Sequence, residues 1–237
     1  MLELWAWVEL HKKQVLWAAG GALVVLIVVY LVLYQRAQTE LAASKQLLSL
    51  KALGGADETA GTAAPNEFLK VAREYSSTRS AERALLLAAG GLYGEGKYAE
   101  AQVQFEKFVS DYGSSILAPI AAFGVASSID AQDKTKEAEA AYQSVIEKYP
   151  TDAAANRARL SLAGLYELEK KPELALKLYD EMLTPTARGQ GANDARKKRD
   201  DLLREHPSLA PTNALPLVAP IKPTAPAATK TNAAAAK

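Results

Sequence analysis

The sequence AEAAYQSVIEKY, residues 138–149, is one copy of a repeated pattern, because the same pattern occurs on either side of it. Residues 101–112 and 175–183 carry the same step from alanine to an aromatic residue, and the copies begin at 101, 138 and 175, which are 37 residues apart. The aromatic positions are Phe105, Tyr142 and Tyr179. Stepping back by the same interval reaches Ala64 and Phe68, so a fourth copy lies upstream. A fixed period of this length indicates a repeat architecture.

Each aromatic-bearing segment follows a second segment with helical periodicity. Leu85, Ala88, Ala89 and Leu92 have the i, i+3, i+4, i+7 spacing of one buried helix face. Prolines support pairs of helices, since proline is tolerated in the first turn of a helix and breaks its interior. The body prolines fall at expected helix starts or between units: Pro65, Pro119, Pro150, Pro172 and Pro185. No long alternation of apolar and polar residues argues for strands, so we expect an all-α body.

This pattern resembles the tetratricopeptide repeat, a pair of helices packed closely through small residues. The first-helix small position is Ala89, Ala126 and Ala163, and the second helix carries the Ala-x-x-x-aromatic step. The 37-residue period resembles the longer-spaced variants of bacterial envelope proteins. The resemblance covers about residues 61–187 and implies an α-solenoid that binds other proteins or peptides.

Composition divides the rest of the chain into segments. Residues 15–34 are apolar and uncharged, and a helix of that length crosses a hydrocarbon layer of about 30 Å. We expect a single transmembrane helix there, contacting the lipid bilayer, with a short cytoplasmic segment at 1–14. A cleaved signal peptide is the alternative, but its apolar core would be shorter. The lysine pair at 12–13 favours a cytoplasmic N-terminus and an extracytoplasmic, periplasmic repeat domain at 35–206. Residues 207–237, rich in Ala, Pro and Thr, predict a disordered tail.

Both ends of the repeat domain need a helix of their own. Residues 35–53 are expected to continue the membrane helix and to form the first helix of the earliest pair, through Leu47, Leu48 and Leu50. At the other end, Asn193 or Asp194 is expected to cap a last helix that runs to about His206. A polar terminal helix seals the core of a solenoid.

Several functions are disfavoured by composition. The net charge of +1 argues against nucleic acid as a partner, and the absence of cysteine excludes thiolate metal sites and cysteine nucleophiles. Only His11 and His206 are histidines, and neither lies inside the repeats. Residues 91–98, GLYGEGKY, imitate a phosphate-binding loop, but Tyr98 replaces the small hydroxyl residue and no strand precedes it. We therefore expect an interhelical turn there, no enzyme activity, no cofactor, no metal and no small-molecule substrate.

Binding is the remaining function, and the resemblance places it on the first helices, which line the concave surface of such solenoids. Carrying those positions over by register gives three rows: Arg83, Leu86 and Tyr93; Ile120, Phe123 and Asp130; Arg157, Leu160 and Glu167. Apolar side chains would supply affinity for a peptide and charges would orient it. The alternative is that Leu86, Phe123 and Leu160 belong to the core.

Two functional hypotheses follow. The layout of one membrane helix before a helical-repeat domain resembles the ancillary subunit of the bacterial Sec translocon. That resemblance implies an envelope scaffold in the inner membrane, with a chaperone-like role in protein export and with the translocon and periplasmic chaperones as partners. The alternative is a structural coordinator that links the inner membrane to cell-wall or division machinery.

Overall fold

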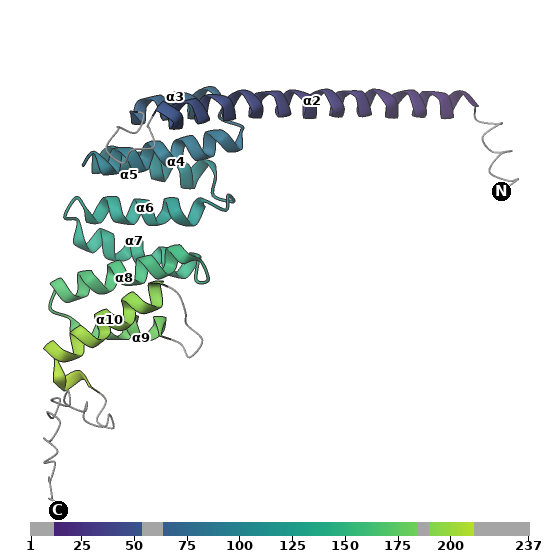
Figure 1. Ribbon diagram of the computed structural model, residues 1–237. Helices are drawn as coiled ribbons and strands as arrows, with labels where there is room; N and C mark the ends of the chain where they lie inside the picture. The colour runs from purple at the N-terminus through teal and green to yellow at the C-terminus, as the bar shows by residue number, and fades with distance from the viewer. Residues whose placement is uncertain (1–11, 54–63, 184–189, 211–237) are drawn as a thin grey trace, which may run out of the picture.

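The computed structural model describes residues 12–53, 64–183 and 190–210, and every regular element within these ranges is a helix (Figure 1). In chain order the elements are α2 (Lys12–Leu53), α3 (Pro65–Glu74), α4 (Arg79–Gly94), α5 (Tyr98–Asp111), α6 (Ala118–Asp130), α7 (Thr135–Lys148), α8 (Ala153–Leu168), α9 (Pro172–Met182), α10 (Gln190–Glu205) and the 3-10 helix η1 (Pro207–Leu209). From α3 to α9 the helices stack as successive antiparallel pairs, which confirms the predicted all-α solenoid.

The 37-residue register places the same kind of residue at the same place in each pair. The aromatic residues of the second helices are buried, with exposed fractions of 6% for Phe105, 1% for Tyr142 and 0% for Tyr179. Phe68 in α3 occupies the same position and is also buried. The small residues Ala89, Ala126 and Ala163 are completely buried, so the two helices of a pair approach closely there.

The turn inside each pair also repeats. Gly96, Asp133 and Lys170 each have a positive φ, between 57° and 76°, and they are 37 residues apart. The next residue donates its backbone N–H to a carbonyl five residues earlier, as in Lys97 to Leu92 at 2.9 Å and Lys171 to Tyr166 at 2.8 Å. Such a bond ends the first helix of a pair, and it requires the preceding residue to adopt the left-handed backbone conformation. The phosphate-loop imitation at 91–98 is therefore one copy of this turn, as expected.

α2 joins the apolar stretch to the repeats without a break. Its C-terminal part packs on α3 and α4, where Ala43 and Leu47 are buried and Leu50 is partly buried. The expected contribution of Leu48 is wrong, because its side chain is 65% exposed. It lies off the face formed by residues 43, 47 and 50.

Glu40 fixes α2 to the start of α4. The backbone N–H of Arg79 donates to Oε2 of Glu40 at 2.8 Å, and the N–H and hydroxyl of Ser80 donate to Oε1 at 3.0 and 2.7 Å. Thr78 caps the same helix from within the chain by accepting the N–H of Ala81 at 3.0 Å. A carboxylate at a helix N-terminus satisfies free donors and complements the helix dipole.

α10 covers the last helix pair, as predicted for a terminal helix. Ala192, Ala195 and Leu202 form its buried face, and Arg199 contacts Asp180 of α9. The helix begins at Gln190, so the expected cap at Asn193 or Asp194 is wrong: both lie inside it, beside the buried alanines. The tail is also shorter than predicted, because residues 207–209 form η1. The remaining expected tail, 211–237, and the segment 1–11 lie outside the described residues.

Candidate protein-binding surface

The first helices α4, α6 and α8 border a cavity of about 460 Å³, which we call the first-helix groove. It is lined by Leu86, Gly90, Tyr93, Phe105, Ile120, Phe123, Gly124, Ser127, Asp130, Tyr142 and Ser161. Phe105 and Tyr142 reach it from the second helices α5 and α7. Its walls are mostly apolar, and its polar groups come from tyrosine and serine hydroxyls and one carboxylate.

Five of the nine residues expected on the binding surface line this groove. They are Leu86, Tyr93, Ile120, Phe123 and Asp130. The structure therefore brings the rows of α4 and α6 together. The row of α8, namely Arg157, Leu160 and Glu167, and Arg83 of α4 lie outside the lining.

The alternative that Leu86, Phe123 and Leu160 belong to the core is correct in part. All three are partly buried and pack against the core residues beneath them. Phe123 meets Tyr142 with ring centroids 5.9 Å apart. Leu86 and Phe123 nevertheless border the groove, so one side of each contacts the core while the other faces the cavity.

The charged residues expected on the binding surface differ in their exposure and hydrogen bonding. Arg83 and Arg157 are exposed, and they flank Ile120, which is 41% exposed and occupies the same register in the pair between them. Asp130 accepts a hydrogen bond from the hydroxyl of Tyr142 at 3.1 Å, and Glu167 accepts one from Tyr179. Each of these two carboxylates is therefore hydrogen-bonded to a tyrosine of its own helix pair.

Burial affects the tyrosines that make these bonds. Burial raises the pKa of Tyr142 to about 12, with hydrogen bonds to Ser127 and Ser161 offsetting part of the effect and Asp130 adding to it. The pKa of Tyr179 is raised by burial and by its bond to Glu167. Both hydroxyls therefore stay protonated at neutral pH and act as donors.

Small residues form the floor of the groove, and none of them is among the nine residues predicted for the binding surface. A side chain at Gly124 would meet the ring of Phe105 at 2.6 Å, so glycine permits the close contact of α5 and α6. At Gly90 nothing lies within 4 Å of an added Cβ, so this position opens onto the cavity. Gly90, Ser127 and Gly164 are 37 residues apart. That row of small residues was the signal available in the sequence.

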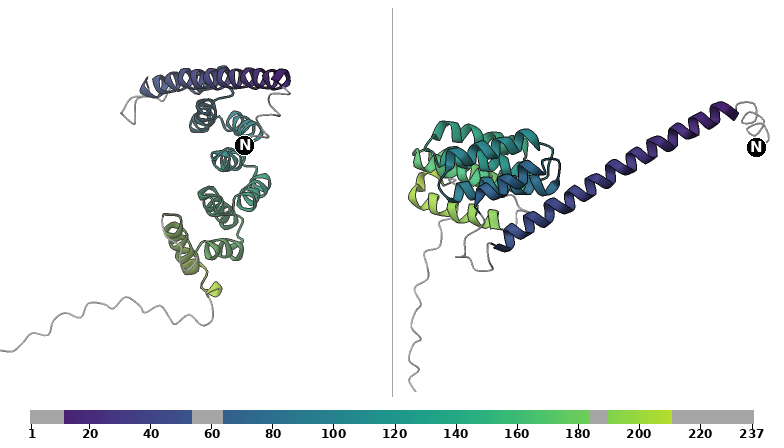
Figure 2. Two further views of the ribbon diagram at one scale, coloured as in Figure 1. Left: turned by 90° about the vertical axis from the view of Figure 1, so that its right-hand side faces the viewer. Right: turned by 90° about the horizontal axis from the view of Figure 1, so that it is seen from above.

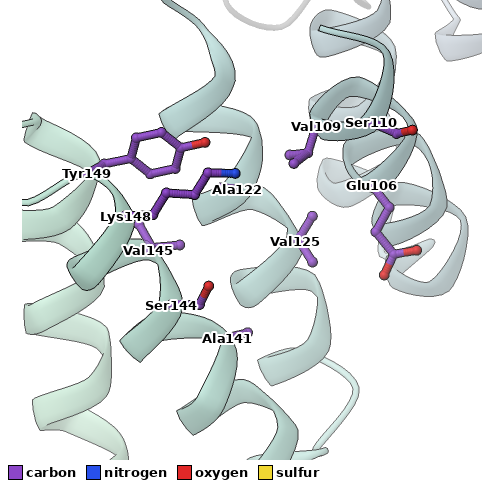
Figure 3. Close-up of a pocket in the computed structure, with 10 residues that line it drawn as sticks. All are labelled: Glu106, Val109, Ser110, Ala122, Val125, Ala141, Ser144, Val145, Lys148 and Tyr149. Carbon is purple, nitrogen blue, oxygen red and sulfur yellow. The ribbon is translucent and has the colours of Figure 1, made fainter. Parts of the chain in front are cut away.

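A second cavity, of about 340 Å³, lies on the other side of α6, between α5 and α7 (Figure 3). We call it the second-helix groove; Val109, Ala122, Val125, Val145, Lys148 and Tyr149 are among its lining residues. The ammonium of Lys148 lies 5.4 Å from the ring centroid of Tyr149. The hydroxyl of Tyr149 is buried without a hydrogen-bond partner, whereas its equivalent Tyr112 donates to the carbonyl of Ser76 at 2.6 Å.

Comparison with known proteins supports the fold. A family model described as a tetratricopeptide repeat-like domain matches residues 99–196. The repeats are tetratricopeptide-like. A tetratricopeptide repeat protein from Parabacteroides merdae superposes with a TM-score of 0.51 at 14% identity, covering 72% of this chain and 68% of its own. TPR-like repeats of a Podosopora anserina protein described as a kinesin light chain give a TM-score of 0.49 at 11% identity, covering 74% of this chain and 88% of theirs. Comparison with curated proteins gave no match.

Repeats of this kind generally act as scaffolds for other proteins. At 14% identity, the likeness to the Parabacteroides merdae structure shows the fold alone and leaves the partner open. The first-helix groove combines apolar walls with exposed charges beside it, which is the composition expected of a peptide site.

Proposed function

We propose that this chain is a membrane-anchored scaffold of the bacterial envelope, and that its first-helix groove binds an extended or helical segment of another protein. The groove is the observation that carries the proposal. Its apolar wall of Leu86, Ile120 and Phe123 would accept apolar side chains of the partner. Because Asp130 and Glu167 are engaged by tyrosines, Arg83 and Arg157 are the charges free to orient a partner, and they favour one with carboxylates.

The membrane anchor is supported by α2. Residues 20–50 are the one stretch in the described part of the chain that is long and apolar enough to span a bilayer. From Leu23 to Tyr34 the large side chains are between 44% and 68% exposed, with no protein surface covering them. A bilayer is the environment in which such a surface is stable. Lys12 and Lys13 favour an N-terminus on the cytoplasmic side and the repeats outside the cytoplasm.

Within this proposal, an ancillary or chaperone-like role beside the Sec translocon is the preferred assignment. The alternative is a structural coordinator of cell-wall or division machinery. A photoreactive amino acid at Ile120, in the full chain in its native membrane, would distinguish them. Adducts with translocon subunits and exported chains support the first assignment, and adducts with cell-wall factors support the second. Adducts of the same identity and yield from exposed Lys136, on α7, would exclude the groove as the binding site.

Charge reversal tests the groove itself. Replacing Arg83 and Arg157 with Glu should abolish these adducts while leaving the melting temperature almost unchanged, because exposed substitutions alter stability by less than about 0.5 kcal/mol. Lys148 is unsuitable for a control pair, because it lines the second-helix groove. Lys107→Glu with Lys136→Glu is the better control, since neither lines either groove. If this control pair removes the adducts and the arginine pair does not, the assignment to the first-helix groove is wrong.

Topology is tested separately. A reporter that is active only outside the cytoplasm, fused after residue 206, should be active. If only a cytoplasmic reporter at the same position is active, the repeats lie on the cytoplasmic side.

A further inference from the structure

The first helices of the solenoid all point in the same direction as α2. α4, α6 and α8 begin at the edge of the stack from which the apolar half of α2 projects, and the second helices α3, α5 and α7 end there (Figure 1). The loops between pairs, 75–78, 112–117 and 149–152, therefore share this edge, which we call the loop edge. The turns inside the pairs, 95–97, 131–134 and 169–171, lie at the opposite edge, the turn edge.

The hydrogen bonds of Glu40 fix the position along α2 at which the loop edge lies. Its carboxylate binds the first residues of α4, which directly follow the loop 75–78. Only six residues separate Glu40 from Tyr34, the end of the apolar stretch. At a rise of about 1.5 Å per residue that separation is about 9 Å along the helix. The headgroup layer on each side of a bilayer is about 5–8 Å thick. The loop edge therefore starts close to the headgroups.

Because of the direction in which the helix pairs stack, the later pairs lie at about the same position along the axis of α2 as the first pair. α2 crosses the stacking direction of the helix pairs both in Figure 1 and in the side view of Figure 2. When α2 passes through a bilayer, the pairs consequently follow one another along the membrane plane and do not extend away from it. The junction is held by Ala43 and Leu47, which are buried, in addition to the bonds of Glu40.

We infer that the solenoid lies on the membrane, with its loop edge against the lipid headgroups and its turn edge facing away. This inference rests on the proposed anchor and adds the interaction surface. It also places the first-helix groove beside the bilayer, with the groove walls rising from the lipid surface. A partner bound there would then be held at the membrane.

The loop edge has a composition that a headgroup layer accepts. Ile116 is 88% exposed, and it lies in the loop 112–117, which is longer than the other two loops. Ser77, Ser114 and Thr151 are exposed hydroxyl residues, one in each loop. Two carboxylates in or beside the loops accept hydrogen bonds from loop or helix-start groups: Glu82 accepts a bond from Ser115 at 2.7 Å, and Asp152 accepts the N–H of Ala154 at 2.8 Å. A carboxylate that keeps such a bond loses less free energy when it is partly removed from water than one without a partner.

Fluorescence quenching tests this arrangement, because the chain contains no cysteine and one introduced thiol carries one label. Ser77→Cys, Ser114→Cys and Thr151→Cys place labels on the loop edge at a spacing of 37 residues. The matched variants Lys97→Cys, Lys134→Cys and Lys171→Cys place labels on the turn edge at the same spacing. Each full-length variant is reconstituted into phosphatidylcholine–phosphatidylglycerol vesicles in which some lipids carry a nitroxide on the headgroup.

All three loop-edge labels should be quenched several-fold more strongly than all three turn-edge labels. Quenching at position 77 without quenching at 114 and 151 would overturn the inference, because the solenoid would then rise away from the bilayer. Equal quenching at both edges would overturn it as well. Flotation of the same vesicles reports on the anchor separately: failure of the unlabelled chain to float with them would refute the proposed anchor itself.

Discussion

Tyr142 joins the core to the first-helix groove, since its ring is 1% exposed and its hydroxyl bonds to Asp130. Replacing it with Ala should lower the free energy of unfolding of the repeat domain by about 3–5 kcal/mol, because a cavity replaces a buried ring. Tyr142→Phe keeps the ring and should cost only about 1 kcal/mol for the lost hydrogen bond. Denaturant unfolding of both variants measures the difference. Equal stability of Tyr142→Ala and the parent domain would show that the 37-residue register is wrong.

Alkaline pH should destabilise the fold through the same residue. The pKa of Tyr142 is about 12 in the folded chain and ordinarily about 10 for an exposed tyrosine. The folded state therefore holds this proton more tightly, so its contribution is complete below about pH 10 and is lost as the pH rises towards 12. The free energy of unfolding should fall across that range, and less steeply in Tyr142→Phe. An identical pH dependence in the two proteins would contradict the role of Tyr142.

Two glycines of the groove floor should respond oppositely to alanine. Gly124→Ala places a methyl group 2.6 Å from the ring of Phe105 and should cost about 1–3 kcal/mol through overpacking. Gly90→Ala meets no neighbouring atom and should stabilise α4 by up to about 1 kcal/mol, because alanine favours helix. Melting curves compare the two. A loss of stability in Gly90→Ala would mean that the position is not open.

The register predicted buried residues well and groove residues incompletely. Phe105, Tyr142 and Tyr179 follow from periodicity alone, since equivalent positions in stacked repeats have equivalent surroundings. Gly124 does not follow, because its importance depends on how closely one particular ring approaches. The tyrosine–carboxylate bonds were missed for a similar reason. They join two helices of one pair across twelve residues of sequence, and spacing alone does not show which side chains meet.

Among the elements, α2 combines two tasks in one helix. Its first part is apolar on all sides, while residues 40–50 present a buried face to α3 and α4. The sequence predicted both parts and their continuity. It did not predict Glu40, because a helix cap supplied from a distant segment leaves no local pattern. α10 illustrates the converse error, since Asn193 and Asp194 have the composition of a cap but lie inside the helix.

Loss of the Glu40 carboxylate should loosen the joint between α2 and the solenoid. Glu40→Ala leaves the N–H groups of Arg79 and Ser80 without their acceptor, and comparable losses at helix N-termini cost about 0.5–2 kcal/mol. Hydrogen exchange of these two amides should become faster. Thr39→Ala is the control, because Thr39 bonds only to carbonyls of its own helix. Equal acceleration in both variants would assign the effect to α2 as a whole.

At the scale of the whole molecule, the described residues form a core of two clusters that meet at α6. One runs from Leu47 to Ala121 and the other from Ala126 to Leu202, with Val125 packing against both. Each helix pair is stabilised mainly by its neighbours, as in other solenoids. The N-terminal cluster is closed by α2 and the C-terminal cluster by α10. The two ends of the stack therefore depend on different helices for their stability.

Removing α10 should consequently weaken one end of the molecule and leave the other intact. A chain that ends at residue 183 exposes the surface of α8 and α9 that Ala195 and Leu202 cover, so its melting temperature should fall. Hydrogen exchange should accelerate first in α9, whereas α4 keeps its protection, because the lost contacts lie at the far end of the stack. A chain that ends at residue 210 keeps α10 and η1 and should melt like the full chain. If α4 and α9 lose protection together in the shorter chain, the two clusters unfold as one cooperative unit, and the solenoid transmits the loss of its cap through α6 to the end that packs against α2.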